Sequence, residues 1–272
     1  MMDAGKKAEK EEGGYKMDIK LLSKDKEGRK ASFAITGTTD WFANTMRRLM
    51  IEEVPTLAIE DVEFRDNSSA LYDEIIAHRL GLIPIKTDLK SYNLPEKCSC
   101  KGKGCSKCQL KMILKSKSQG IVYAEEIKSK DSKCKPVYPR MPIAKLLKGQ
   151  QLQAEMTAVM GKGKNHAKWT SCLVWYRGWP EFIVGKNADV KACIDQCPQL
   201  EQSGNNLKIK DITKWNEAYE EICEKNDVKV KNNNTHFIFN IESWGQLDIK
   251  DIVKEAVNIF QKKVDDLTKQ LK

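Results

Sequence analysis

The C-terminal segment of the chain carries one apolar stripe at helical spacing over about six turns. Charged and amide side chains occupy most positions between the apolar ones. A helix of this length must cover its apolar face, either on its own domain or on a partner, and the pattern leaves both alternatives open. The stripe consists of Ile249, Ile252, Val253, Ala256, Val257, Phe260, Val264, Leu267 and Leu271.

The 272 residues suffice for one large domain or several small ones, with a net charge of +9. This charge suits contact with nucleic acid or acidic proteins, and equally a solvated basic surface. Residues 1–15, rich in Lys, Glu and Gly, lack the apolar core of a signal peptide and are predicted to be a disordered tail. No apolar run approaches the roughly 18 residues of a membrane span. We therefore expect a cytoplasmic protein.

The first third of the chain contains clear local patterns. MDIKLLSKDKEGRKASFAITG alternates around a turn and predicts a β-hairpin. TTDWFANTMRRLMIEEVP predicts a helix capped by Asp40 or Thr39 and closed by Pro55. TLAIEDVEF is strand-like, and ALYDEIIAHRLGLIPI predicts a second helix that stops at Gly81.

Four of the nine cysteines lie in the stretch CSCKGKGCSKC. Four thiolates at this spacing can close a tetrahedral Zn²⁺ site, and Gly102 and Gly104 allow the tight turn that it needs. A filled four-sulfur shell has no open position, so the site would be structural. A reduced loop without an ion stays an alternative. The proposed ligands are Cys98, Cys100, Cys105 and Cys108.

Three lysines, Lys101, Lys103 and Lys107, lie between these cysteines. They could touch phosphate, or they could offset the negative charge of four thiolates. No base-reading helix follows the loop, so we interpret it as a structural element and not as a sequence-specific finger.

FANTMRRLMIEEVPTLAIEDVEFRDNSSALYDEIIAHRLGLIPI resembles the signature of one RNA polymerase subunit family. The family includes the archaeal D subunit, the bacterial α N-terminal domain and the third-largest subunit of eukaryotic polymerase II. Asn44, Arg47 and Arg48 match, as do GKGKNHAKW at 161–169 and IESWG at 241–245. The insertions resemble the archaeal form, and a eukaryotic nuclear subunit stays an alternative.

The resemblance implies an α+β fold with a discontinuous α-like dimerisation domain, made of a β-hairpin, two helices and the long C-terminal helix. We assign residues 16–84, 169–176 and 232–272 to this domain. Residues 85–168 are predicted to form a β-rich insertion that holds the cysteine loop. Residues 177–231 are predicted to form a degenerate ferredoxin-like insertion.

The resemblance also implies a non-catalytic assembly subunit of a DNA-directed RNA polymerase, which is a nucleotidyltransferase. It would pair with subunit L and form a platform for subunits N and P and the two large catalytic subunits, touching DNA only indirectly and no membrane. No catalytic residue is expected, because the chain has no short Asp-rich motif of the kind that holds two Mg²⁺ ions. The predicted interface residues are Arg47, Arg48, Ile252, Ala256, Phe260, Val264 and Leu267.

The two arginines could instead form contacts within the chain. Neighbouring positions of a helix lie about 100° apart, so the two side chains cannot both enter one core. At least one should therefore point outward.

Some related archaeal subunits bind [4Fe–4S] clusters through C-x2-C-x2-C-x3-C-P runs. Here only Cys193, Cys197 and Cys223 remain at such positions, so neither cluster has four ligands. We predict the fold without a cluster, its cavity filled by residues such as Val190 and Tyr219. A mixed site recruiting Cys172 or Cys134 stays an alternative.

Two other classes of function fit parts of the sequence. Nine cysteines suggest a free-standing iron–sulfur redox protein, which a bound cluster would identify. The basic balance and the lysine-rich loop suggest a free zinc-dependent nucleic-acid-binding protein, whose binding would depend strongly on salt.

Overall fold

The computed structural model describes residues 17–204 and 206–271, so the predicted tail at 1–15 lies outside the described residues. The predicted α+β class is confirmed. The chain forms two compact units. Of the described residues, the main unit comprises Leu22–Ser32, Asn44–Tyr176 and 239–271, and the small unit comprises 17–21, Phe33–Ala43, 177–204 and 206–238.

The predicted hairpin is present as β1 (Asp18–Lys24) and β2 (Lys30–Thr36). Its turn holds Gly28 at a φ of 71°, in the left-handed region that glycine enters without a steric cost. These strands belong to a four-stranded sheet in the order β1-β2-β12-β9, with β9 at Cys172–Val184 and β12 at Val228–Ser243. The limit between the two units falls inside β9 and β12, so both strands run through it.

A second four-stranded sheet has the order β3-β8-β4-β6 and builds the largest core of the main unit. Its central strands are antiparallel, with Leu57 opposite Met160 and Leu110 opposite Ala158. Strand β4 alternates buried and exposed side chains, as one core face requires. The strands are β3 (Pro55–Asn67), β4 (Gln109–Ser116), β6 (Lys128–Ser129) and β8 (Leu152–Lys162).

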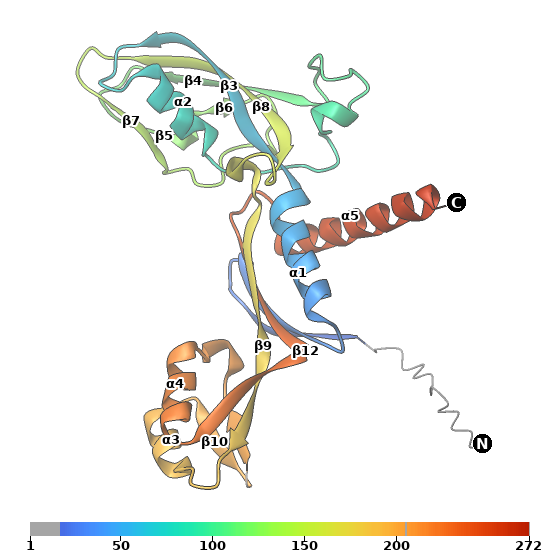
Figure 1. Cartoon of the computed structure of the whole chain (residues 1–272). Helices are drawn as coiled ribbons and strands as arrows, with labels where there is room; N and C mark the ends of the chain where they lie inside the picture. Colours follow the sequence, from blue (N-terminus) through green and yellow to red (C-terminus); the bar gives the residue numbers. More distant parts are fainter. Residues whose placement is uncertain (1–16, 205, 272) are drawn as a thin grey trace. The chain divides into compact units, whose positions relative to one another are not determined.

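Helix α2 (Asp73–Gly81) covers this sheet and ends at the predicted Gly81 (Figure 1). Its Ile76 and Leu80 are fully buried in the same core as Leu57 and Leu114. The hairpin-like pair β5 (Gly120–Tyr123) and β7 (Pro142–Leu146) closes the core beside α2. Short 3-10 turns lie at Pro95–Lys97, Ala124–Glu126, Ala167–Trp169 and Ile212–Lys214.

The strand pairing differs from the predicted grouping of residues 16–84 in one respect. The predicted dimerisation domain includes β3 and α2, whereas β3 pairs along its length with β8, and α2 packs into the core of that sheet. Strand propensity alone cannot say which sheet a strand joins, because the partner lies about a hundred residues away. The domain boundaries stay a prediction.

The residues of the candidate interface lie on helical elements, α1 (Asp40–Arg48), η1 (Leu49–Glu53) and α5 (Ile249–Gln270). Helix α1 continues into η1, a π-helical turn, which ends before Pro55 as predicted. Helix α5 matches the predicted apolar stripe, and it contacts η1.

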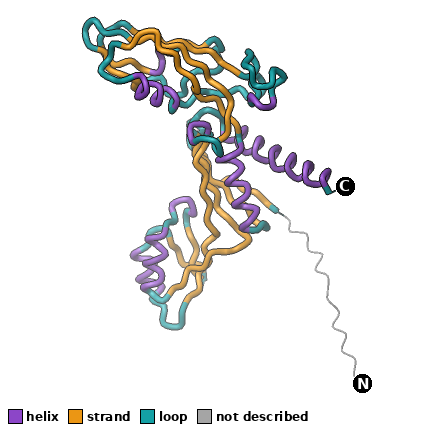
Figure 2. The backbone as a smooth tube through the Cα atoms, turned by 45° about the horizontal axis from the view of Figure 1, so that its top comes forward, coloured by secondary structure: helices purple, strands orange, loops and turns teal. Residues whose placement is uncertain are grey.

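The small unit places two short helices, α3 (Val190–Gln196) and α4 (Glu217–Lys225), side by side (Figure 2). The hairpin of β10 (Leu200–Ser203) and β11 (Asn206–Ile209) joins them. Trp215 is buried between Phe182 and Tyr219, with ring centroids 5.5 and 5.6 Å away. Cys193, Cys197 and Cys223 have no exposed surface.

Candidate partner interface and candidate metal centre

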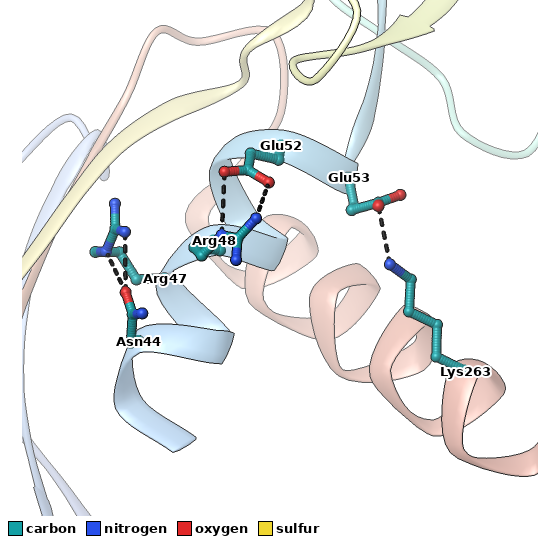
Figure 3. Close-up of polar contacts among 6 residues, drawn as sticks. All are labelled: Asn44, Arg47, Arg48, Glu52, Glu53 and Lys263. Atoms are coloured by element: carbon teal, nitrogen blue, oxygen red, sulfur yellow. Dashed lines mark hydrogen bonds and ion pairs between the residues drawn. The ribbon is translucent and has the colours of Figure 1, made fainter. Parts of the chain in front are cut away.

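Helix α1 places the two arginines of the signature on neighbouring positions. Asn44 accepts hydrogen bonds on Oδ1 from Arg47 Nε at 3.2 Å and Nη2 at 2.9 Å (Figure 3). This i,i+3 contact holds the half-buried Arg47 along the surface of its own helix. Asn44 therefore orients Arg47.

Arg48 is exposed and pairs with η1, the turn that comes next in the chain. Its Nε and Nη2 donate to the two carboxylate oxygens of Glu52 at 3.3 and 3.2 Å (Figure 3). Such a two-pronged contact fixes the plane of the guanidinium. The structure thus shows the alternative of intramolecular pairing for Arg48, and contact with a partner stays a prediction.

Glu53 connects η1 to two other parts of the main unit. Its carboxylate accepts a hydrogen bond from Lys162 Nζ at 2.9 Å. It accepts a second one from Lys263 Nζ, on α5, at 2.8 Å (Figure 3). Burial alone would raise the pKa of Glu53, but the hydrogen bonds and charges of the two lysines outweigh it and lower the pKa to about 2. Glu53 is therefore ionised at neutral pH and holds α5 against η1.

Two glycines of the GKGKNHAKW segment lie where a larger residue would not fit. A Cβ on Gly163 would collide with the carbonyl oxygen of Ile51, and a Cβ on Gly161 would collide with the buried ring of Trp169. Lys164 N donates to the Glu52 carbonyl at 2.9 Å. The segment packs against η1 because glycine allows backbone to approach backbone.

Helix α5 divides into two parts. Ile252 and Ala256 are fully buried, and Phe260 is half-buried. Beyond them the apolar side chains face solvent: Val264 is 41% and Leu267 57% exposed. Val257 and Leu271, at 48% and 79%, extend the same stripe. We call these four residues, Val257, Val264, Leu267 and Leu271, the exposed stripe.

For Ile252 and Ala256, contact with a partner stays a prediction. Both side chains are fully buried within this chain. The periodicity could not separate the two alternatives, because a stripe at helical spacing looks the same against its own domain and against a partner.

The cysteine loop lies between η2 (Pro95–Lys97) and β4 and brings its four sulfurs together. All four Sγ atoms lie within 4.8 Å of one another. Sγ of Cys98 is 3.5 Å from that of Cys105, and Sγ of Cys100 is 3.5 Å from that of Cys108. Gly102 and Gly104 have φ values of 79° and 89°, which confirms the predicted tight turn.

The size of this sulfur cage fits zinc. Zn–S bonds of about 2.3 Å in a tetrahedron put the sulfurs about 3.8 Å apart. Burial, together with the three neighbouring thiols, raises the pKa of Cys108 to about 12. Cys100 is also partly desolvated, but hydrogen bonds from Cys108 and the other thiols lower its pKa to about 6. The four thiols therefore cannot all ionise without a cation, and Zn²⁺ would be held by Cys98, Cys100, Cys105 and Cys108.

The lysines of the loop, Lys101, Lys103 and Lys107, are exposed. Among residues 17–204 and 206–271, no other set of three or more His, Cys, Asp or Glu side chains is close enough to share a metal ion.

Known proteins resemble both the insertion and the whole chain. The family model for the RNA polymerase Rpb3/RpoA insert domain matches residues 60–172, a range that takes in most of β3. DNA-directed RNA polymerase subunit Rpo3 of Methanosphaera stadtmanae is 37% identical over 265 residues, covering 92% of this chain and 97% of that protein. The Rpo3 subunits of Methanosarcina acetivorans and Pyrococcus horikoshii are 35% and 34% identical, at 92% and 93% coverage of this chain.

The chain belongs to the Rpo3 family. Rpo3 is the archaeal D subunit, so the resemblance in the sequence is confirmed. None of the described helices of this Rpo3-family chain combines the length and apolar character needed to cross a bilayer.

The cysteines of the small unit form a different arrangement in this Rpo3-family chain. Cys193 Sγ lies 3.3 Å from Cys223 Sγ, on α3 and α4. Cys134 is buried in the core of the β3–β8 sheet, and Cys172 Sγ lies 3.7 Å from the carbonyl oxygen of Met50. Both therefore have surroundings of their own in the main unit, and the alternative of a mixed cluster that recruits them gains no support.

Sequence reasoning missed two contacts that position the Rpo3-family signature. One is the hydrogen bond that Arg79 Nη1 donates to the carbonyl oxygen of Ile143 in β7 at 2.9 Å, which ties α2 to β7. The other contact is that of Glu53 with Lys162 and Lys263, and no local pattern in the segment IEEVP indicates it, because both lysines lie far away in the sequence.

Proposed function

We propose that this chain is a non-catalytic assembly subunit of an archaeal multi-subunit DNA-directed RNA polymerase. Membership of the Rpo3 family over 92% of the chain carries this proposal. The chemistry of nucleotidyl transfer would lie in other subunits, and this chain would hold them together in the cytoplasm. The archaeal relatives favour this form over a eukaryotic nuclear subunit.

The partner at the exposed stripe would be the smaller α-like subunit, subunit L. Four large apolar side chains on one helix face are costly to leave in water, and covering them gives about 25 cal/mol per Å² of apolar area. Obligate subunit interfaces are built from such surfaces. Phe260, half-buried at the junction with the buried part of α5, would lie near the centre of the contact.

The arginines of α1 would serve a different neighbour. Arg48 already presents a planar, charged fork together with Glu52, and Arg47 is fixed by Asn44. A large catalytic subunit with carboxylates or backbone carbonyls would suit this surface. Subunits N and P and the second large subunit would complete the assembly, with DNA contacted only indirectly.

Zinc in the cysteine loop would be a structural part of the subunit. Its four sulfurs would close the ion's coordination, so it would order the loop and bind no substrate.

Co-expression with subunit L tests the proposal. The expected result is a one-to-one heterodimer by mass in solution, with the lone chain self-associating. A well-behaved monomer that ignores subunit L would contradict the assembly function. Strong salt-dependent DNA binding by that monomer would favour the free nucleic-acid-binding alternative, and bound iron would favour the redox alternative.

A further inference from the structure

In the small unit two cysteine thiols contact each other, and the proposed assembly gives them no role. Cys193 in α3 and Cys223 in α4 are both fully buried, and their Sγ atoms lie 3.3 Å apart. The two residues are 30 positions apart in the sequence. A bond between them would therefore link the two helices of the unit across the intervening hairpin.

This pair differs from the cysteine loop because it brings together two sulfurs and not four. The third buried cysteine, Cys197, does not complete a set of three thiols within metal-ligand range among the described residues. Two sulfurs alone cannot satisfy the four-coordinate preference of zinc. Two thiols in contact can instead form a covalent bond, since the sulfurs need to close by only about 1.3 Å to reach disulfide length.

We propose that Cys193 and Cys223 form a structural disulfide bond that joins α3 to α4. The oxidant would be a low-molecular-weight disulfide. One cysteine thiolate attacks a sulfur of that disulfide and releases the first small thiol, leaving a mixed disulfide. The second cysteine thiolate attacks the protein sulfur of this mixed disulfide and releases the second small thiol. Two electrons and two protons pass from the cysteines to the reagent.

Burial determines when this reaction can happen. Burial raises the pKa of Cys223, and contact with Cys193 raises it further, so few thiolates form in the folded unit. A small disulfide cannot reach either sulfur without local opening. The bond should therefore form during folding or rare opening, and once formed it should resist reduction for the same reason.

Oxidation of the full-length chain by glutathione disulfide during refolding, with zinc present, tests the proposal. Tryptic mapping without reductant should show the peptide that contains Cys193 and Cys197 joined to the peptide that contains Cys223. Because two cysteines share one peptide, variants assign the bond: C193S and C223S should abolish the joined peptide, and C197S should keep it.

Amide hydrogen exchange gives a second readout. In the oxidised protein, exchange in α3 and α4 should slow at least about tenfold relative to the reduced protein, with β4 of the main unit unchanged, because the bond limits opening of the small unit alone. A joined peptide that survives in C193S but disappears in C197S would overturn the proposal. So would glutathione adducts without a joined peptide, or iron bound to these cysteines.

Discussion

Two regions of the main unit differ in how far their apolar side chains are buried within the chain. The sheet of β3, β8, β4 and β6 buries its core against α2, β5 and β7, all from the same chain. Helix α5 buries only its first turns and leaves the exposed stripe in solvent. The sheet region covers its apolar core with elements of the same chain, whereas α5 keeps an apolar face exposed, which we propose is one half of an interface.

Within the sheet region, we expect the largest effect from removing a zinc ligand of the cysteine loop. Zinc binding in small four-ligand sites contributes about 10–16 kcal/mol at neutral pH, far more than any single contact. We expect C105S to lower the zinc content from about one per chain to none, since three thiolates do not close the shell. Residues 98–108 should then lose exchange protection.

The exposed Ser106 provides the matched control in the same loop, and S106A should keep its zinc. Metal analysis by atomic emission, with circular dichroism to confirm that the sheet stays folded, checks both variants. Full zinc occupancy in C105S would mean that the four-sulfur arrangement is not the binding site.

The core of the sheet gives the next largest effect. Leu114 is fully buried, and its neighbour Ile113 points to the other face at 39% exposure. L114A should lower the free energy of unfolding by about 2–5 kcal/mol through lost burial and a cavity. Urea unfolding of L114A and the control I113A measures the difference. Equal losses in the two variants would contradict a core closed on one face.

The exposed stripe should behave in the opposite way. L267D places a carboxylate where the structure has solvent, so the stability of the isolated chain should change by no more than about 0.5 kcal/mol. Binding to subunit L should weaken at least about thirtyfold, because a charge would be buried in an apolar contact.

Lys269 lies on another face of the same helical turns and is exposed, so K269D introduces the same side chain as a control. Isothermal titration with subunit L compares the variants. If K269D weakens binding as much as L267D, the exposed stripe is not the contact surface. The proposed contrast between α5 and the sheet region would then be wrong.

The sequence predicted the helices and strands of both regions better than the contacts that these elements make within the chain. Helix α5, the first hairpin and the four-cysteine set follow from periodicity and spacing, which are local properties. The pairing of β3 with β8 and the burial of Ile252 and Ala256 depend on residues far away in the chain. The Glu53 contacts with Lys162 and Lys263, likewise, join residues more than a hundred positions apart. No local pattern contains that information.

We expect the smallest effect from replacing Glu53. This residue connects the two regions, because it joins η1 to both β8 and α5. Its folded-state pKa, about 2, lies below the unfolded value of 4.5, so its ionisation stabilises the fold above pH 4.5. That contribution is lost as the pH falls from 4.5 through 2. Since Lys263 is more than half exposed, solvent screening limits the contribution to about 1–2 kcal/mol.

We expect E53Q to be less stable than the wild-type chain at pH 7 by about that amount, and the difference to shrink as the pH approaches 2. Urea unfolding at several pH values measures it, and E63Q, at an exposed glutamate of β3, is the control with no expected loss. A difference that stays constant with pH would show that the amide disturbs packing and that charge is not the cause. A pH-dependent loss accompanied by weaker binding to subunit L would show that Glu53 sets the position of α5 on which the exposed stripe depends.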